Sequence, residues 1–119
     1  MKELIHEAKR QFTDSPLNNN DYGKIVNEKH FNRISGLINN SKVVLGGASN
    51  ADSLRIEPTI MDNVTFDDAV MQEEIFGPIL PVLPYRSFSQ ALTEVRRRPK
   101  PLALYLFTND GDHKRRALR

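Results

Sequence analysis

The first apolar positions of the chain recur at the spacing of one helical face. They predict a helix from about Lys2 to Phe12, because residues three and four apart in a helix lie on the same side. The stripe consists of Leu4, Ile5, Ala8 and Phe12. The stretch from Thr13 to Asp21 contains a proline and consecutive asparagines without any period, so it is expected to form a surface connection, with a hinge between two packed pieces as the alternative.

A second stripe at helical spacing follows this connection. It consists of Phe31, Ile34, Leu37 and Ile38. Asn27 is placed to accept a hydrogen bond from the first free backbone amides of this helix. A strand from Lys42 to Leu45 is expected next. Gly46 and Gly47 should end that strand, since paired glycines permit backbone angles that other residues resist.

An extended stretch is expected from Arg55 to Ile60. Pro58 lies inside it, and proline cannot donate a hydrogen bond to the ladder of a sheet. We therefore expect this stretch to be either an edge strand or an irregular strand.

The last third of the chain has the most regular pattern. It predicts a strand from Ile79 to Leu83, a helix from Ser87 to Arg98 and a strand from Leu102 to Phe107, which together make a βαβ unit. The second strand is apolar on both faces, as expected for a strand buried between helix layers in a parallel sheet. Ser87 and Gln90 fit the capping box of the predicted helix, and Asp110 is expected to cap a further helix that begins near Gly111. The predicted fold class is α/β, with helices packed on a mostly parallel sheet.

Composition and charge favour a folded chain. Of its 119 residues, 39% are hydrophobic, and the formal net charge is only +2, which is unlike a disordered chain. Basic residues gather after Val95, and they raise the alternative of nucleic-acid binding. The run Arg96 to Arg98 lies at a predicted helix end, where cations oppose the negative end of the helix dipole, and no aromatic side chains for base stacking are interleaved with it. A solvated helix end, without nucleic-acid binding, is therefore favoured.

Several classes of protein are disfavoured by what the sequence lacks. No apolar run is long enough for a membrane helix, and the first residues lack a secretory apolar stretch, so a soluble, cytoplasmic protein is expected. Without cysteine, the chain has no disulfide, no thiolate metal site and no cysteine nucleophile. The three histidines are too scattered in sequence for a recognisable metal motif, so no metal is expected.

The stretch from Gln72 to Pro78, with the sequence QEEIFGP, is the strongest candidate site. Its glycine-proline pair favours a tight turn, and the adjacent Glu73 and Glu74 should point different ways. A carboxylate accepts hydrogen bonds from both hydroxyls of a ribose, and a neighbouring aromatic ring covers the apolar face of the sugar. From the residues alone a plainer alternative stays open, in which Phe76 belongs to the core and both glutamates lie on the surface.

Longer blocks of sequence before, around and after this stretch carry a family resemblance. The blocks are Asp21 to Phe31, Lys42 and Val43 with Gly46 and Gly47, Glu57 to Ile60, Val70 to Pro81, and Lys100 to Phe107. In their order and spacing they resemble the aldehyde dehydrogenase superfamily, most closely its class 3, fatty-aldehyde-type branch. The resemblance runs from about Asp21 to Asp110. It implies that residues 1–119 form one partial catalytic domain, downstream of the nucleophile of the family.

The resemblance also implies a reaction, the oxidation of an aliphatic or aromatic aldehyde to a carboxylic acid. In the family a cysteine thiolate attacks the aldehyde, hydride passes to NAD or NADP, and the thioester is then hydrolysed. The second glutamate of the family block holds the nicotinamide ribose, and the phenylalanine packs beside it. These cofactor-binding roles fall on Glu74 and Phe76. Losing Glu74 should affect turnover as well as binding, because the anchored ribose fixes the geometry of hydride transfer.

The sequence departs from the complete family pattern. It has no cysteine, and the general-base glutamate, the oxyanion asparagine and the dinucleotide-binding half are absent as well. No catalytic residue is therefore assigned, and the chain is expected to be inactive alone. One alternative is a non-catalytic interaction or scaffold protein that associates with a full-length dehydrogenase, and another is a degraded product without function. Enzymes of this branch are often dimers, which makes a homodimer a further alternative.

Overall fold

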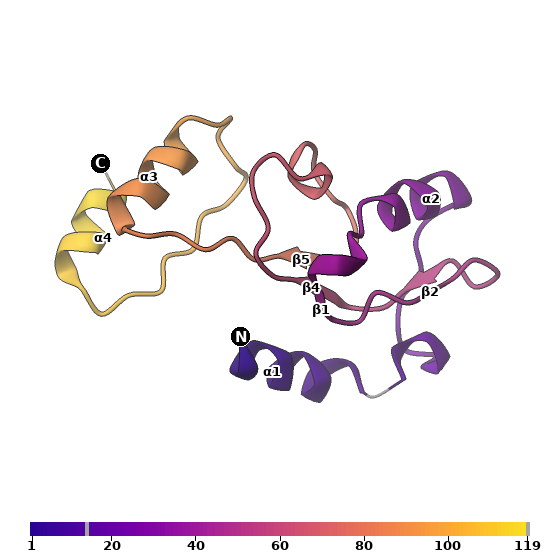
Figure 1. Cartoon of the computed structure of the whole chain (residues 1–119). Helices are drawn as coiled ribbons and strands as arrows, with labels where there is room; N and C mark the ends of the chain where they lie inside the picture. The colour runs from indigo at the N-terminus through magenta and orange to yellow at the C-terminus, as the bar shows by residue number, and fades with distance from the viewer. Residues whose placement is uncertain (14, 119) are drawn as a thin grey trace. The chain divides into compact units, whose positions relative to one another are not determined.

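A computed structural model describes residues 1–13 and 15–118 of the chain. Asp14, which belongs to the predicted connection from Thr13 to Asp21, and Arg119 lie outside the described residues. The chain divides into two compact units, Met1–Leu83 and Pro84–Arg119. The main elements of the first unit are α1 (Lys2–Phe12), α2 (Glu28–Gly36), β1 (Val43–Leu45), β2 (Ser49–Asn50), β3 (Arg55–Ile56), β4 (Thr59–Met61) and β5 (Ile79–Pro81), shown in Figure 1. Short 3-10 helices cover Pro16–Asn18, Asn40–Lys42 and Ala69–Met71.

The first unit is built on a three-stranded sheet with the order β1-β4-β5. Strand β1 pairs with β4 in antiparallel register, with an irregularity between Val43 and Leu45. Strand β5 pairs with β4 in parallel register, so that Thr59 faces Ile79. Strands β2 and β3 form a separate antiparallel pair. The predicted α/β class is therefore confirmed, and the sheet that carries it is partly parallel.

Both predicted helices of this unit form, but the second ends at Gly36, before Leu37 and Ile38 of its predicted stripe. Helix α1 has the predicted bounds, and α2 begins after Asn27, whose side chain accepts a hydrogen bond from the His30 backbone amide at 2.9 Å. Strand β1 ends at two glycines with positive φ, 74° at Gly46 and 97° at Gly47. This backbone region favours glycine, because a β-carbon there meets the neighbouring carbonyl. The glycine pair ends the strand as predicted.

The stretch around Pro58 is irregular, which was one of the two alternatives. Strand β3 ends at Ile56 and β4 begins at Thr59, so Pro58 lies between strands and needs no ladder partner for its nitrogen. The edge alternative holds for β3, which is one strand of a two-stranded sheet, and is wrong for β4, which is the central strand of its sheet.

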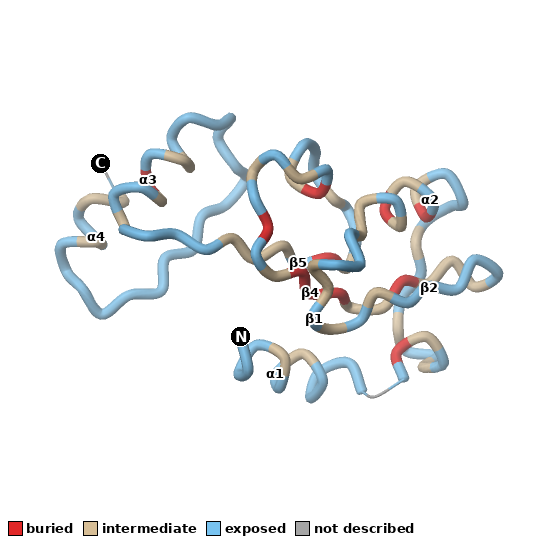
Figure 2. Tube along the Cα trace, viewed as in Figure 1, coloured by how far each residue is buried: buried red, intermediate tan, exposed pale blue. Residues whose placement is uncertain are grey.

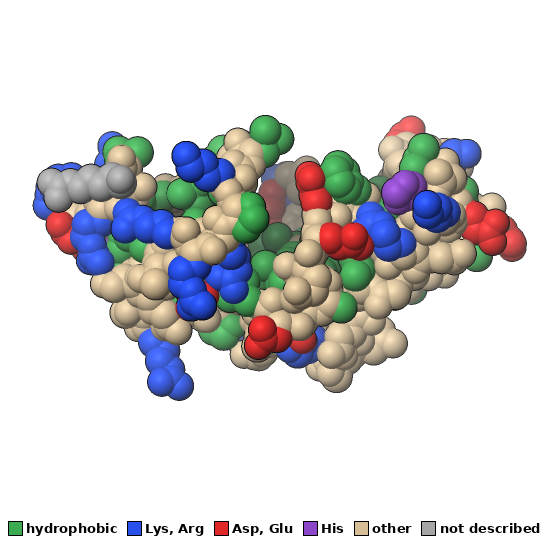
Figure 3. Space-filling view, turned by 90° about the horizontal axis from the view of Figure 1, so that it is seen from above, with side chains coloured by type: hydrophobic (Ala, Val, Ile, Leu, Met, Phe, Trp, Pro, Cys, Tyr) green, Lys and Arg blue, Asp and Glu red, His purple; other side chains and the backbone are tan. Residues whose placement is uncertain are grey.

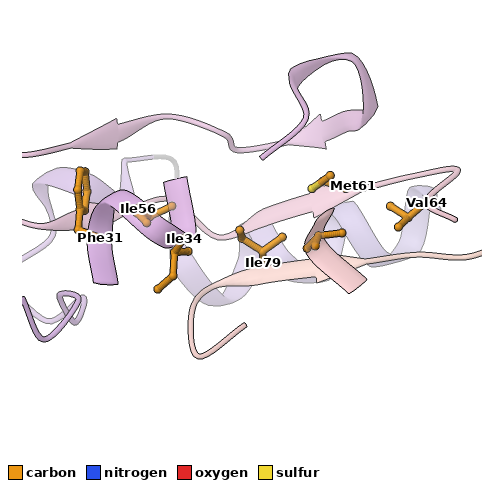
Figure 4. Packing of buried hydrophobic residues seen from close by; sticks show 7 residues of the cluster. Phe31, Ile34, Ile56, Met61, Val64 and Ile79 are labelled. Carbon is orange, nitrogen blue, oxygen red and sulfur yellow. The ribbon is translucent and has the colours of Figure 1, made fainter. Parts of the chain in front are cut away.

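The core of the first unit lies between α2 and the strands. It consists of the buried residues Phe31, Ile34, Ile56, Met61, Val64, Val70 and Ile79, most of which Figure 4 labels. Helix α2 contributes Phe31 and Ile34, the latter with no exposed surface. Fully burying an aliphatic or aromatic side chain of this size contributes about 1.5 to 3 kcal/mol each. This cluster therefore fixes α2 as a rigid support for the segments beside it.

Helix α1 and the connection after it differ from a simple surface segment. No residue of α1 is buried, and Leu4, Ala8 and Phe12 of its stripe line a groove together with residues of β4 and β5. The Phe12 ring meets the Tyr22 ring edge-on at 6.0 Å between centroids. Pro16 is buried, so the predicted surface connection is wrong at this residue. None of the helices in residues 1–13 and 15–118 combines the length and apolar character needed to cross a membrane.

The second unit contains helices α3 (Phe88–Arg96) and α4 (Gly111–Ala117). Both are capped as predicted, α3 by Ser87, which accepts from the Gln90 amide at 3.2 Å, and α4 by Asp110, which accepts from the Asp112 amide at 2.7 Å. The two helices meet where the Phe88 ring stacks on the His113 ring at 4.0 Å. The caps stabilise the start of each helix, and the ring stack packs the two helices against each other.

The predicted strand from Leu102 to Phe107 is wrong for the described structure. These residues carry no strand assignment, and all of them are exposed, as Figure 2 shows for this segment. A strand that is apolar on both faces needs strands beside it and helix layers over it. The second unit provides two helices and no strand within its described residues, so the βαβ unit does not form. Tyr105 is 79% exposed instead of packed.

Basic side chains gather over the second unit, as Figure 3 shows. At the end of α3, Arg98 donates to the Glu94 carbonyl at 2.6 Å and to the Glu94 carboxylate at 2.8 Å. Arg97 donates to the same carboxylate at 3.2 Å. These contacts lower the Glu94 pKa, chiefly through the hydrogen bond from Arg98. The arginines lie at the end of a helix, as predicted, and their contacts with Glu94 were not predicted.

Candidate functional site

The candidate site is the loop from Gln72 to Pro78, which joins the 3-10 helix Ala69–Met71 to β5. Its first residue closes the turn, because the Gln72 side chain donates to the Phe66 carbonyl at 2.8 Å and to the Asp68 carbonyl at 3.2 Å. Its last residue joins the sheet, since the Pro78 carbonyl accepts from the Thr59 amide of β4 at 2.8 Å. The loop is therefore fixed at both ends.

The two adjacent glutamates have different surroundings. Glu73 accepts a hydrogen bond from Arg33 of α2 at 2.8 Å. Glu74 is exposed, and its carboxylate has neither a hydrogen-bond donor nor an ion-pair partner within residues 1–13 and 15–118. The Glu73 carboxylate is thus already paired with Arg33, while the Glu74 carboxylate is available to accept hydrogen bonds from a ligand.

Arg33 is a residue of this site that the sequence analysis missed. One guanidinium nitrogen reaches Glu73, and the other donates to the Ile75 carbonyl at 2.7 Å. The partners are 40 and 42 positions away in the chain, so no local sequence pattern predicts the contact. The one available signal is position: Arg33 precedes the buried Ile34 on α2, next to the predicted apolar stripe.

Phe76 lies on the surface with an unusual backbone. Its side chain is 73% exposed, and its φ is 49°. The alternative in which Phe76 belongs to the core is therefore wrong, whereas both glutamates are on the surface as that alternative held. A bulky residue in this region is uncommon, and such a conformation costs about 1 to 3 kcal/mol and persists only where its surroundings impose it.

Gly77, the next residue, approaches α2 closely. A β-carbon on Gly77 would lie 2.9 Å from both Cδ1 and Cγ2 of Ile34. Ile34 has no exposed surface and cannot swing away freely. Only glycine fits at this point, and the tight contact sets how the chain passes from Phe76 into β5.

A second contact supports the segment that precedes the loop. Lys42 forms an ion pair with Asp68 at 2.5 Å, and Asp68 also accepts from the Thr65 amide at 2.6 Å. The hydrogen bond from Lys42, followed by that from Thr65, lowers the Asp68 pKa. This pair ties the entry of the loop to the residue that precedes β1.

The chemistry of the loop fits the sugar of a cofactor better than a metal. Among the described residues no three histidine, aspartate or glutamate side chains are grouped so that they could hold a metal ion. Glu74 offers an accessible carboxylate without a partner, and Phe76 offers an exposed ring two residues later. A carboxylate accepts two hydrogen bonds from neighbouring hydroxyls, and a ring covers an apolar face. The two residues together can bind a ligand that has neighbouring hydroxyls and an apolar face.

Comparison with known proteins gives a family match over the whole chain. Residues 1–119 match the family described as "Aldehyde dehydrogenase family". The chain is 51% identical over 100 residues to 4,4'-diaponeurosporen-aldehyde dehydrogenase of Staphylococcus aureus. This alignment covers 82% of this chain and 22% of that protein. It is 46% identical over 109 residues to aldehyde dehydrogenase family 3 member B1 of Bos taurus. This alignment covers 92% of this chain and 23% of that protein. Both relatives carry the reaction in their names, and the second carries the class predicted from the sequence.

A solved structure extends the match to the fold. The substrate-bound state of Staphylococcus aureus AldH has 44% sequence identity and a TM-score of 0.92, covering 98% of this chain and 26% of that chain. The chain thus spans about a quarter or less of the length of the relatives it matches.

Proposed function

Because this chain belongs to the aldehyde dehydrogenase family, we propose that it is the part of such an enzyme that contacts the nicotinamide ribose. The free carboxylate of Glu74, beside a neighbouring carboxylate that is already paired, is the observation that carries this proposal. The chain has no cysteine, so the nucleophile of the reaction is not among its residues. The full enzyme would oxidise an aldehyde, aliphatic or aromatic, to a carboxylic acid.

Glu74 is proposed to accept hydrogen bonds from the two hydroxyls of the nicotinamide ribose. Hydrogen bonds to an ionised acceptor are about twice as strong as neutral ones, and two acceptor oxygens on one group match two neighbouring hydroxyls. The position of a ribose fixes the position of the ring it carries. Glu74 therefore fixes the position of the nicotinamide ring, and its loss should lower kcat as well as weaken cofactor binding.

Phe76 is proposed to cover the apolar face of the same sugar. Its ring is 73% exposed and lies outside the buried cluster of the first unit, and its backbone is in the left-handed region, with a φ of 49°. An exposed ring held in a strained conformation is typical of a binding surface.

The cofactor of the full enzyme is proposed to be NAD or NADP. Homologues in the family bind these dinucleotides. When bound, the nicotinamide ring accepts the hydride that leaves the substrate. The residues of this chain hold and orient its ribose, and none of them takes part in bond making.

The similarity to dehydrogenases over most of the chain supports this function in preference to a non-catalytic scaffold. The predicted homodimer, an association with a full-length dehydrogenase and a cytoplasmic location remain predictions. Light scattering of the purified full enzyme tests the first two, and cell fractionation tests the third.

An exchange of segments tests the proposed function. The matching segment of Staphylococcus aureus AldH is replaced by this chain, since the two superpose over 98% of it, and aldehyde-dependent reduction of NAD(P)+ is measured. In the exchanged enzyme, Glu74→Gln is expected to raise the KM for NAD(P)+ and lower kcat, each by about tenfold or more.

Glu3→Gln provides the matched control, because Glu3 is an exposed glutamate on α1, outside the loop. It should leave both constants unchanged. The same response to Glu74→Gln and Glu3→Gln would refute the proposed contact.

A further inference from the structure

We propose that Arg33 is a positioning residue for the cofactor, which acts by holding the loop on both sides of Glu74. Its guanidinium donates to the carboxylate of Glu73 at 2.8 Å and to the carbonyl of Ile75 at 2.7 Å. These two residues immediately precede and follow Glu74. The inference rests on the proposed function, because it takes Glu74 to be the ribose contact.

The two hydrogen bonds come from one rigid group. A guanidinium is planar, and its N–H bonds diverge at fixed angles, so two acceptors that it binds have a fixed separation. Here the acceptors are a side chain and a backbone carbonyl on either side of one residue. Their fixed separation restricts the backbone of Glu74 to a narrow range, and its side chain leaves the loop in one direction.

The support behind Arg33 is rigid as well. Arg33 retains only 26% of its side-chain exposure, and it precedes Ile34, which is completely buried in the core. Helix α2 also carries the capped start at Asn27. A positioning group is useful only if its own position is fixed, and the packed helix provides that.

The contact also separates the charges of the two adjacent glutamates. Arg33 neutralises Glu73, so Glu74 is left as the single unpaired negative group of the loop. Without Arg33, the two carboxylates would repel each other, and both would compete for the same hydroxyls or for solvent cations. Arg33 thereby assigns the ligand-accepting role to one carboxylate.

The chain contains no tryptophan, so Phe76→Trp provides a single fluorescent reporter on the loop. In this variant of the full chain, Arg33→Gln is expected to speed the decay of tryptophan fluorescence anisotropy, since the loop loses its hold. Arg55→Gln is the matched control, because Arg55 also donates to a backbone carbonyl, that of Leu17 at 2.9 Å, away from the loop. Equal anisotropy decay in the Arg33 and Arg55 variants would overturn the inference.

The segment-exchanged enzyme gives the functional readout. Arg33→Gln is expected to lower kcat/KM for NAD(P)+ by about 10- to 100-fold, as a displacement of about 1 Å at a reacting geometry does. The KM for the aldehyde and the urea midpoint of the protein should stay nearly unchanged, since a partly exposed ion pair adds little to stability. Arg33→Lys should restore only part of the loss, because an ammonium cannot bridge both acceptors in the same geometry.

The two proposals fail in different ways. If Glu74→Gln changes nothing in the exchanged enzyme, the ribose contact itself is wrong, and the inference on Arg33 is overturned with it. If Glu74→Gln lowers kcat/KM for NAD(P)+ while Arg33→Gln does not, the ribose contact stands and Arg33 is only a surface residue. We expect each single variant to lower kcat/KM for NAD(P)+. The double variant, Glu74→Gln with Arg33→Gln, should lower it by less than the product of the two single effects.

Discussion

Gly77 and Ile34 are so close that a β-carbon on the glycine would lie 2.9 Å from two carbon atoms of the isoleucine. The isoleucine has no exposed surface. The contact joins the candidate loop to the core of the first unit, so stability and the geometry of the loop are linked at this point.

Gly77→Ala is therefore expected to destabilise the chain by about 1 to 3 kcal/mol, because the added methyl group must displace a packed side chain. Urea unfolding followed by circular dichroism measures the loss. Gly23→Ala is the control, since nothing lies within 4 Å of a β-carbon there. Equal unfolding midpoints for the two variants would contradict the packing described.

Gly46→Ala is expected to be more damaging than Gly77→Ala. A β-carbon on Gly46 would overlap the Pro58 carbonyl oxygen, and the φ of 74° is itself unfavourable for alanine. Backbone atoms cannot move aside as the end of a side chain can, so we expect a loss of about 3 kcal/mol or more. The same urea measurement, with Gly23→Ala as the control, gives the loss in free energy of unfolding. A loss no larger than that of Gly77→Ala would be inconsistent with the overlap.

The Lys42–Asp68 pair should make stability depend on acid pH. The hydrogen bond from Lys42 and that from the Thr65 amide lower the Asp68 pKa in the folded state. A lowered folded pKa stabilises the fold above the unfolded value, about 3.9, and this contribution is lost as the pH falls through the folded pKa. Asp68→Asn should therefore lower the urea midpoint at neutral pH and converge with the wild type in acid. Asp67→Asn, an exposed neighbour, should show no such pH-dependent difference.

Tyr22 should make stability depend on alkaline pH. Burial, followed by the charge of Glu57, raises the pKa of Tyr22 to about 12, and its hydroxyl donates to the Ile56 carbonyl at 2.8 Å. A raised folded pKa contributes stability that is complete below the unfolded value, about 10, and that is lost as the pH rises through the folded pKa.

Tyr22→Phe tests this directly. At neutral pH it should cost about 1 kcal/mol, because the Ile56 carbonyl loses its donor. The difference from the wild type should then shrink as the pH rises toward the folded value. Tyr85→Phe, at a tyrosine that is 64% exposed, should cost little at any of these pH values, and a pH-independent cost of Tyr22→Phe would count against the assignment.

Local signals in the sequence predicted the local structure well. The bounds of α1, the caps at Asn27, Ser87 and Asp110, and the stop at the glycine pair all depend on residues a few positions apart. Such features are set by helix spacing and by backbone donors, which the sequence displays directly.

Long-range features could not be predicted in the same way. The strand expected from Leu102 to Phe107 has the right composition, but a strand requires a partner, and its composition does not say whether one is present. The Arg33 contact spans 40 positions, and no periodicity predicts it. The left-handed backbone of Phe76 likewise does not follow from its own propensity, because a bulky residue rarely adopts a positive φ.

The Glu74 carboxylate is proposed to accept hydrogen bonds from the nicotinamide ribose. The most direct test is the segment-exchanged enzyme with natural NAD(P)+ and with an analogue whose nicotinamide ribose lacks one hydroxyl. We expect Glu74→Gln to lower kcat/KM strongly with the natural cofactor and much less with the analogue, because the partner of the carboxylate is then missing. An equal loss with both cofactors would show that Glu74 does not contact the ribose hydroxyls.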